Sequence, residues 1–227
     1  METRDIEQWR INRRNFLLLT GGAICSSMLT YEMVKASDTR QSTAEFIEST
    51  CEKEGKMKNR VLIAYASRHG STGGVAEAIG QVLCETGVSV DVRLVGNVND
   101  LSPYHAVIVG SAIRMGRWLP EAVDFVKKHQ ETLSRLPTAY FVVCLTMGND
   151  TPENRRKVLA FLDPVRKQAA KIKPVDIGLF AGALDYKKLS FFYRLMFKVT
   201  GAPNGDIRNW EAIRTWATGL RPALLGM

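Results

Sequence analysis

Histidine and cysteine are scarce in this chain of 227 residues, which holds three His and four Cys. No two cysteines form a Cys-x-x-Cys pair, and the three histidines stand far apart in sequence. Metal sites need clustered ligands of these types, so the sequence predicts no metal site. Cys84 falls on the apolar face of an expected helix and Cys144 inside an expected strand, where small core side chains are common. We expect neither metal nor disulfide roles for the four cysteines.

Two familiar nucleotide-binding loops are also absent. A Walker loop needs Gly-x-x-x-x-Gly-Lys, and no Lys follows Gly70, Gly73 or Gly74. The same glycines do not have the Gly-x-Gly-x-x-Gly spacing of a dinucleotide loop. The sequence has no helix-turn-helix, zinc or aromatic RNA-binding motif either, so its positive charge does not indicate a nucleic-acid partner.

A different phosphate site is indicated near residue 70. The apolar run 61–66 predicts a buried strand, and apolar residues at helical spacing predict a helix from about residue 75. The loop between them contains Ser67-x-x-Gly70-x-Thr72. The exposed N–H groups of a first helical turn and the positive end of the helix dipole favour an anion, and hydroxyl groups add donors. The pattern predicts a phosphate-binding loop, with an ordinary capped turn as the alternative.

Alternating strands and helices fill the rest of residues 58–227. Apolar or alternating runs predict strands over 61–66, 88–95, 106–113, 139–146 and 175–184. Helical patterns follow over 119–133, 153–171 and 210–220. Five strands alternating with helices indicate a doubly wound α/β fold with a parallel sheet. In such a sheet a ligand binds beyond the carboxyl ends of the strands, where the winding direction reverses.

Three loops should meet at that edge, and together they suit the phosphate and ring of FMN. One follows the first strand, one the third and one the fourth. We expect Trp118 either to stack on the flavin ring or to pack on the following helix, and Arg114 either to lie near the flavin N1–C2 edge or to form an exposed salt bridge. The predicted cofactor-binding residues are Ser67, Arg68, His69, Gly70, Ser71 and Thr72; Ser111, Ala112, Ile113, Arg114, Met115, Gly116 and Trp118; and Thr146, Met147, Gly148, Asn149 and Asp150.

Residues 61–220 resemble the flavodoxin-like domain family, and within it the menaquinone-dependent protoporphyrinogen oxidases of flavodoxin type. The strand and phosphate loop over 61–72, the stretch 107–129 and the segment 181–186 followed by Trp210 carry the resemblance. It implies a five-stranded parallel sheet in the order 2-1-3-4-5, bound FMN, a porphyrinogen substrate and a quinone acceptor. It also implies that the flavin performs the chemistry, with no catalytic side chain.

The resemblance also draws attention to residues 185–206, which form a longer connection before the last helix than an ordinary flavodoxin has. Lys187 to Val199 is basic and rich in Phe and Met, a pattern typical of an amphipathic helix on a membrane surface. A helix buried against the sheet is the alternative. Residues 58–227 carry a net charge of +9 and residues 1–57 a net charge of −1, so the folded part should attract anionic lipid or acidic partners.

The N-terminal residues read as a targeting segment. Arg13-Arg14 precedes 17 residues without charge, 15–31, and a small-residue cleavage site ends at Ala36. The run is only moderately apolar, whereas a spanning helix needs about 20 predominantly apolar residues. We expect a twin-arginine signal or membrane anchor over 1–36 and a linker over 37–57, partly helical around 44–51. A disordered tail is the alternative for the first segment.

Two functions remain open at this point. The first is an FMN-dependent oxidoreductase that passes electrons from a porphyrinogen or another reduced substrate to a quinone. The second is a membrane-associated flavodoxin that only carries electrons between proteins. The twin-arginine pattern predicts export or membrane association, which favours the carrier, while the cytoplasmic face of the membrane would favour the oxidase.

Overall fold

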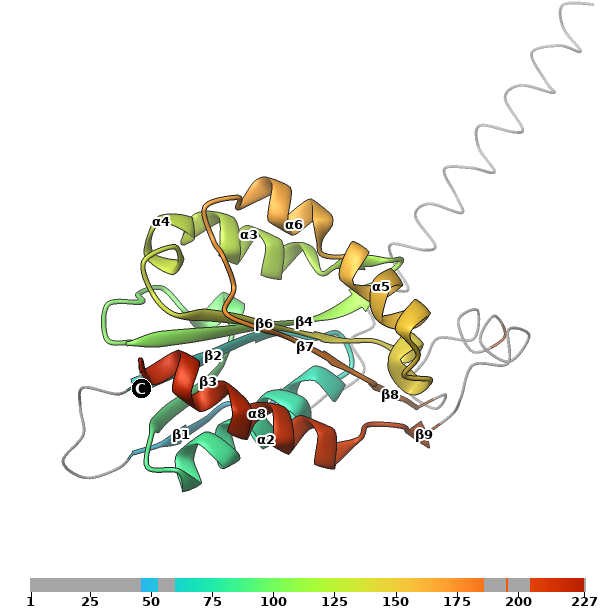
Figure 1. The fold of residues 1–227 in the computed structure, drawn as a ribbon, viewed down its shortest axis with the longest axis horizontal. Coiled ribbons are helices and arrows are strands. Elements are labelled where there is room, and N and C mark those ends of the chain that lie inside the picture. The colour runs from blue at the N-terminus through green and yellow to red at the C-terminus, as the bar shows by residue number, and fades with distance from the viewer. Residues whose placement is uncertain (1–45, 53–59, 186–194, 196–204, 227) are drawn as a thin grey trace, which may run out of the picture. The chain divides into compact units, whose positions relative to one another are not determined.

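The fold consists of a central sheet with helices on both faces (Figure 1). The computed structural model describes residues 46–52, 60–185, 195 and 205–226. All of them belong to one unit, Thr43–Met227. The predicted signal at 1–36 and the predicted helix at Lys187 to Val199, apart from Leu195, lie outside the described residues. The strands are β1 (Ser49–Cys51), β2 (Arg60–Ala66), β3 (Ser89–Leu94), β4 (Ala106–Arg114), β5 (Arg117–Trp118), β6 (Thr138–Val143), β7 (Ile177–Phe180), β8 (Ala183–Leu184) and β9 (Gly205–Asp206).

Helices connect these strands on both sides of the sheet. Helices α2 and α8 cover one face, and α3, α4 and α6 cover the other, with α5 at the side (Figure 1). The helical elements are α2 (Ser71–Glu85), η1 (Val95–Asn97), α3 (Pro120–Lys128), α4 (Gln130–Leu133), η2 (Leu145–Gly148), α5 (Pro152–Ala160), α6 (Asp163–Gln168) and α8 (Trp210–Leu225).

The order of the parallel strands is β3-β2-β4-β6-β7. Numbered along the chain, these five strands have the order 2-1-3-4-5, so the predicted topology is confirmed. Ala66 pairs with Ser111, and Ala112 pairs with Val143. This register brings the ends of β2, β4 and β6 together at one edge, where the three predicted loops begin.

Two predicted helices and one predicted strand are divided in the structure. The helix expected over 119–133 consists of α3 and α4, which separate at His129, and the helix expected over 153–171 consists of α5 and α6. Pro164 in the first turn of α6 has no N–H to donate, so it suits a helix start and not a helix interior. The strand expected over 175–184 ends at Phe180, after which β8 pairs antiparallel with β9.

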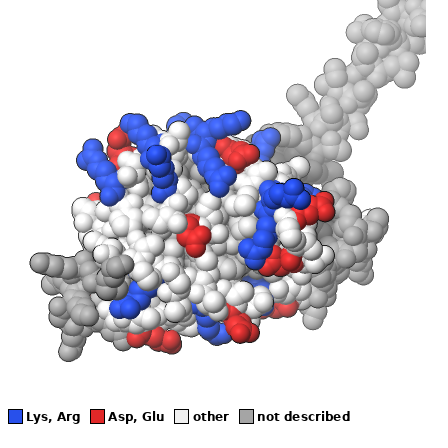
Figure 2. Space-filling model, viewed as in Figure 1, with Lys and Arg blue, Asp and Glu red and all other residues white. Residues whose placement is uncertain are grey.

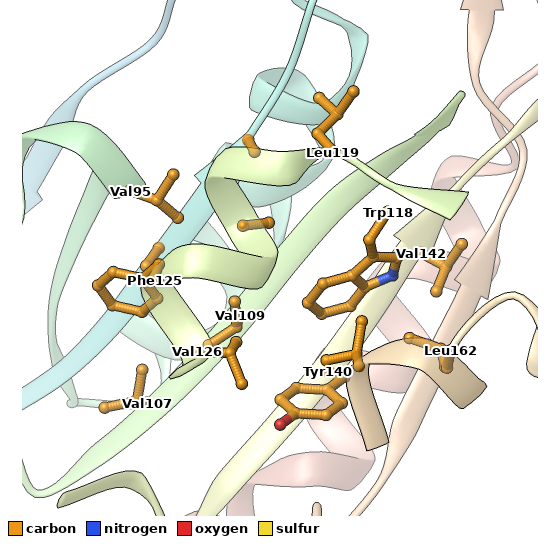
Figure 3. Close-up of a cluster of buried hydrophobic side chains, with 14 of the residues drawn as sticks. Val95, Val107, Val109, Trp118, Leu119, Phe125, Val126, Tyr140, Val142 and Leu162 are labelled. Atoms are coloured by element: carbon orange, nitrogen blue, oxygen red, sulfur yellow. The ribbon is translucent and has the colours of Figure 1, made fainter. Parts of the chain in front are cut away.

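Each face of the sheet has its own apolar core. The core on the α3 side contains Trp118, Leu119, Tyr140 and Leu162 (Figure 3). The core on the α2 and α8 side contains Ile63, Phe141 and Ile213 among its fully buried side chains. Because β2, β4 and β6 are covered on both faces, their residues form continuous apolar runs, which is the pattern that identified them in the sequence.

Strand β1 corrects two sequence predictions. The end of the expected linker helix, Ser49–Cys51, is instead a strand that pairs antiparallel with β3. Cys51 in this strand forms a disulfide with Cys84 of α2, across a Cα–Cα distance of 6.2 Å. No disulfide was expected, because the three residues of β1 have no strand pattern of their own. Their pairing comes from contacts with residues about forty positions away.

A buried carboxylate also holds β1 on the sheet. Asp91 of β3 is 3% exposed and accepts hydrogen bonds from Thr50 Oγ1 at 2.7 Å, Arg60 Nε at 2.7 Å and Tyr104 Oη at 3.0 Å. Burial by itself would raise the pKa of Asp91, but these donors outweigh burial and lower it. The carboxylate therefore stays charged at neutral pH and ties Thr50 of β1 to β2 and β3.

Candidate functional site

The loop between β2 and α2 has the form of an anion cradle. The N–H of Gly70 donates to Ser67 Oγ at 3.0 Å, which closes the loop into a tight turn. Gly70 has a φ of 84°, in the left-handed region where glycine has no Cβ to clash. Helix α2 begins at the next residue without a side-chain hydrogen bond at its N-cap. The N–H groups of its first turn are therefore directed toward the loop.

Thr72 gives this loop a donor for a ligand. Its side chain is fully buried, and Oγ1 has no hydrogen-bond partner among the residues that the structure describes. Leaving a buried hydroxyl unpaired costs about 1–3 kcal/mol, so an acceptor that enters the loop recovers this free energy. A phosphate oxygen is such an acceptor, and the loop thus fits the phosphate group that the sequence predicts.

Not every predicted residue of this loop faces the same way. Arg68 forms a salt bridge with Glu121 of α3 at 3.3 Å, which ties the loop to the neighbouring helix. His69, Gly70 and Ser71 line a cavity on the α2 side. Ser67 and Thr72 are buried inside the loop. The predicted stretch therefore divides into inner residues beside the helix start and outer residues that position the loop.

The second predicted loop is a hairpin between β4 and β5. Met115 and Gly116 form its two-residue turn with φ values of 51° and 72°, both left-handed, while Ile113 pairs with Trp118 and Arg114 with Arg117. Two positive φ values are typical of the turns that join closely paired antiparallel strands. Met115 is 93% exposed at the tip, so it is available to a bound ring or a partner.

Ser111 and Ala112 lie at the base of the hairpin. The buried Ser111 Oγ donates to the Ala112 carbonyl at 2.8 Å and accepts from the N–H of Leu119 at 3.0 Å. Its hydroxyl proton is therefore used within the β4 arm, and its oxygen links that arm to Leu119 beyond β5. Ser111 supports the predicted cofactor loop, but the hydroxyl has no proton left for a ligand.

Trp118 does not have the position that flavin stacking requires. It is 3% exposed, and its ring meets the ring of Tyr140 edge to face at 5.2 Å (Figure 3). The stacking prediction is corrected for this residue, because both faces of the indole lie in the apolar core under α3 and α6. Of the two alternatives from the sequence, core packing is the one that the structure has.

The third predicted loop surrounds η2, after β6. Met147 is 4% exposed, whereas Gly148, Asn149 and Asp150 are exposed. Asp150 forms a salt bridge with Arg155 of α5 at 2.5 Å, so its carboxylate is occupied. Thr146, which directly precedes Met147, is half-buried. The exposed residues 148–150 are the part of this loop that can border a ligand.

A cavity of about 590 Å³ lies beside the phosphate loop, between α2 and the start of α8. It includes residues that the sequence reasoning did not select, above all Arg208 and Trp210. The guanidinium of Arg208 lies 4.2 Å from the centre of the Trp210 ring and donates to the carbonyl of Ser71 at 3.2 Å. In the sequence, the basic residue Arg208 and the aromatic residue Trp210 at the start of the closing helix are the signal that could have indicated this part of the cavity.

Arg208 is held in place by a carboxylate and by a glycine. Asp206 of β9 forms a salt bridge with it at 2.7 Å, and the hydrogen bonds from Arg208 lower the pKa of Asp206. A Cβ at Gly74 of α2 would lie 2.5 Å from Arg208 Nη1, so the glycine lets the guanidinium lie this close to the helix, and a larger residue would shift it. The arginine thereby joins the phosphate-loop helix to the segment that begins α8.

Comparison with known protein families identifies the family to which the chain belongs. A profile of the flavodoxin domain matches residues 62–206, which is more than half of the chain. The chain belongs to the flavodoxin domain family. This membership confirms the fold and the FMN cofactor that the sequence predicts.

Curated relatives and solved structures extend this result. The chain is 30% identical over 174 residues to protoporphyrinogen IX dehydrogenase [quinone] of Leishmania major, covering 70% of this chain and 73% of that protein. It is 27% identical over 172 residues to the protein of the same name in Escherichia coli K12, covering 70% and 92%. Oxidised flavodoxin 2 from Bacillus cereus aligns with a TM-score of 0.48 at 20% identity, covering 71% and 97%.

The side chains near the three loops supply little chemistry of their own. Burial raises the pKa of the Cys144 thiol, so the one free cysteine among the described residues stays protonated at neutral pH. Among those residues, no group of three His, Cys, Asp or Glu could hold a metal ion.

Proposed function

We propose that this flavodoxin-domain protein is an FMN-dependent oxidoreductase that oxidises a porphyrinogen and passes the electrons to a quinone. The observation that supports this most is the pair of relatives named protoporphyrinogen IX dehydrogenase [quinone], each of which aligns over 70% of this chain. The alignment to the bacterial relative covers 92% of that protein, so it includes far more than a shared phosphate loop.

The protein's part in this reaction is binding and orientation. Bound FMN supplies a group that accepts a hydride and releases electrons to an acceptor. Ser67, Gly70 and Thr72 would hold its phosphate, because they combine a turn, N–H groups and a buried free hydroxyl. The exposed tip at Met115 and the loop at 148–150 would border its ring.

A reconstituted oxidation assay tests the proposal. The full chain is purified with excess FMN, and protoporphyrinogen IX is supplied with a menaquinone analogue without oxygen. We expect porphyrin absorbance to rise with wild-type protein and much less with Thr72→Ala at limiting FMN, while Thr215→Ala on the exposed face of α8 serves as the matched control. Yellow, folded protein that oxidises no more porphyrinogen than free FMN does would overturn the proposal.

The compartment in which the protein works is a separate proposal, because export favours an electron carrier and the cytoplasmic face of the membrane favours the oxidase. We infer that the twin-arginine pattern at Arg13 and Arg14 exports it already folded around its cofactor. The Cys51–Cys84 disulfide supports this, because structural disulfides persist mainly in oxidising compartments. Changing both arginines to Lys should keep the protein in the cytoplasm, still yellow. Wild-type protein in the cytoplasmic fraction would contradict export.

One observation favours a second function, in which the protein only carries electrons between proteins. The disulfide indicates an oxidising compartment, away from the cytoplasm where porphyrinogens are made, and a carrier can work there. An electron carrier should show two separate one-electron steps in a redox titration and no turnover of a small substrate. The oxidation assay above distinguishes the two functions.

Membrane association completes the proposal, because quinones dissolve in the lipid bilayer. Within the described parts of the chain, no helix combines the length and apolarity needed to cross a membrane. We propose the basic segment Lys187 to Val199, nearly all of which lies outside the described residues, as one contact with an anionic surface. Deleting residues 187–199 should lower binding to anionic vesicles if this segment contributes.

A further inference from the structure

A basic surface covers one side of the described domain. Lys and Arg side chains gather over α3, α4, α6 and α5, along the upper part of Figure 2. Three acidic residues of residues 120–173 are neutralised in salt bridges with cations of the same stretch: Glu131 with Lys171, Asp150 with Arg155 and Asp163 with Arg166. Seven exposed cations of this stretch form no salt bridge with a described residue: Lys127, Lys128, Arg135, Arg156, Lys157, Lys167 and Lys173.

Few acidic groups offset these seven cations. Asp124 and Glu153 are the two exposed acidic residues of the stretch that form no salt bridge with a described residue. The opposite face differs, since α2 and α8 together carry two basic residues, Arg214 and Arg221, and three acidic ones. Among the described residues, the excess positive charge therefore lies on one side of the sheet.

We propose that this basic face, the exposed cations of residues 120–173, docks the domain on a bilayer of anionic phospholipids. The seven cations are spread over helices α3, α5 and α6 and over two connections, and none of them lines the cavity beside the phosphate loop. Such an extended layout fits a broad surface of negative headgroups better than a small polyanion, which needs converging donors.

The face also lacks what a protein partner would use. Interfaces between proteins are centred on buried aromatic or apolar anchors. The large apolar side chains exposed among the described residues are Met115, Val175 and Leu195, and of these only Val175 is near the basic stretch in sequence. Charge without an apolar centre suits peripheral lipid binding. The inference names a contact surface for the membrane association in the proposed function and rests on that part of it, whereas the oxidation assay tests the chemistry separately.

Binding of this kind has a measurable dependence on charge and salt. Each basic side chain near an anionic membrane surface strengthens binding by about fivefold at physiological ionic strength. Added salt shortens the Debye length to about 3 Å at 1 M and removes most of the effect. Loss of two cations should therefore weaken binding about 20- to 30-fold.

Vesicle flotation of the full, FMN-loaded chain tests the docking face. Vesicles of phosphatidylcholine are compared with vesicles that also contain phosphatidylglycerol, so that any insertion of the N-terminal segment appears in both. The variant Lys127→Gln/Lys128→Gln removes two charges from the basic face. The matched control Thr215→Glu/Thr218→Glu changes the net charge equally, but on the exposed side of α8.

The two double variants should differ in how much vesicle binding they lose. We expect the phosphatidylglycerol-dependent binding to fall about 20- to 30-fold in the lysine variant and less than about threefold in the control. Equal losses in both variants, or an unchanged affinity in the lysine variant, would overturn the proposal. Flavin absorbance and far-UV circular dichroism report that both variants are folded. Absence of phosphatidylglycerol-dependent binding by the wild type would also overturn it and would direct attention to an acidic protein partner.

Discussion

The two faces of the central sheet differ in what their helices do. The face under α3 and α6 has an aromatic core around Trp118 and Tyr140 and a basic exterior. The face under α2 and α8 has a nearly neutral exterior, the helix that follows the phosphate loop, a cavity beside that loop and a disulfide. We infer that the first face contributes mainly core packing and surface contact, and the second mainly ligand binding.

This division of roles can be broken by single substitutions. A change on the aromatic face should alter folding and leave flavin binding to the folded protein alone. A change in the phosphate loop should do the reverse. Substitutions in the disulfide and at the hairpin tip test how far stability and flavin binding can be changed independently.

Trp118→Ala should have the largest effect on stability. Truncating a buried tryptophan typically costs about 3–5 kcal/mol, from lost apolar burial and from the cavity that remains. Urea unfolding followed by circular dichroism measures the loss. Trp118→Phe should cost less than Trp118→Ala, because it keeps an aromatic ring and leaves a smaller cavity, and because it removes an indole N–H that has no partner among the described residues. Full stability together with lost FMN binding would restore the stacking role.

Breaking the disulfide should have the next largest effect. Cys51→Ser opens a closed loop of 33 residues, which should lower the free energy of unfolding by about 2–4 kcal/mol. Wild-type protein in the presence of a reductant should show the same loss, and the reductant should not affect the variant further. FMN affinity should stay unchanged, since Cys84 is near the end of α2 away from the phosphate loop. An equally stable reduced protein would contradict the structural role of the bridge.

Thr72→Ala and Ser67→Ala should weaken FMN binding without unfolding the protein. A hydrogen bond to a charged phosphate contributes about 1.5–3 kcal/mol, which corresponds to roughly tenfold to hundredfold in the dissociation constant. Flavin fluorescence quenching measures this affinity. Thr86→Ala is the matched control, because Thr86 caps the other end of the same helix. Unchanged affinity in both loop variants would show that the loop is only a helix cap.

Met115→Asn should have the smallest effect and affect both roles. Asn tolerates the left-handed φ of 51° better than Met, so the FMN-free protein should gain about 0.5–1 kcal/mol. Loss of a sulfur–aromatic contact with the ring should weaken FMN binding by about two- to tenfold. Thermal unfolding without flavin and titration with flavin separate the two effects. A gain in stability with unchanged affinity would place Met115 outside the cofactor site.

The sequence was most informative where one local pattern decided the structure. Strands β2, β4 and β6 were predictable because burial on both faces forces continuous apolar runs, and the three loops at their ends follow from parallel pairing. The turn from strand to helix at 67–72 was predictable from its glycine and hydroxyl residues, and phosphate binding there stays a prediction. These parts establish the fold and the position of the candidate site.

The remainder depended on contacts between distant residues. Trp118 is large and apolar whether it stacks on a ligand or packs in a core, so its sequence position could not distinguish the two. Cys51 and Cys84 could be paired only after β1 was placed beside β3, and Thr50 reaches Asp91 only in that arrangement. Arg208 became a site residue because Gly74 lets it approach α2, which no local pattern encodes.

The short strand β1 has a consequence for self-association. It pairs with Val90 to Val92 on the side of β3 that faces away from β2, where unpaired N–H and C=O groups would otherwise invite a strand from another molecule. With only three residues, β1 itself is a poor template for pairing with a strand of another molecule. A chain shortened to begin after Glu52 would expose the side of β3, so the strand Ser49–Cys51 protects this edge against edge-to-edge aggregation.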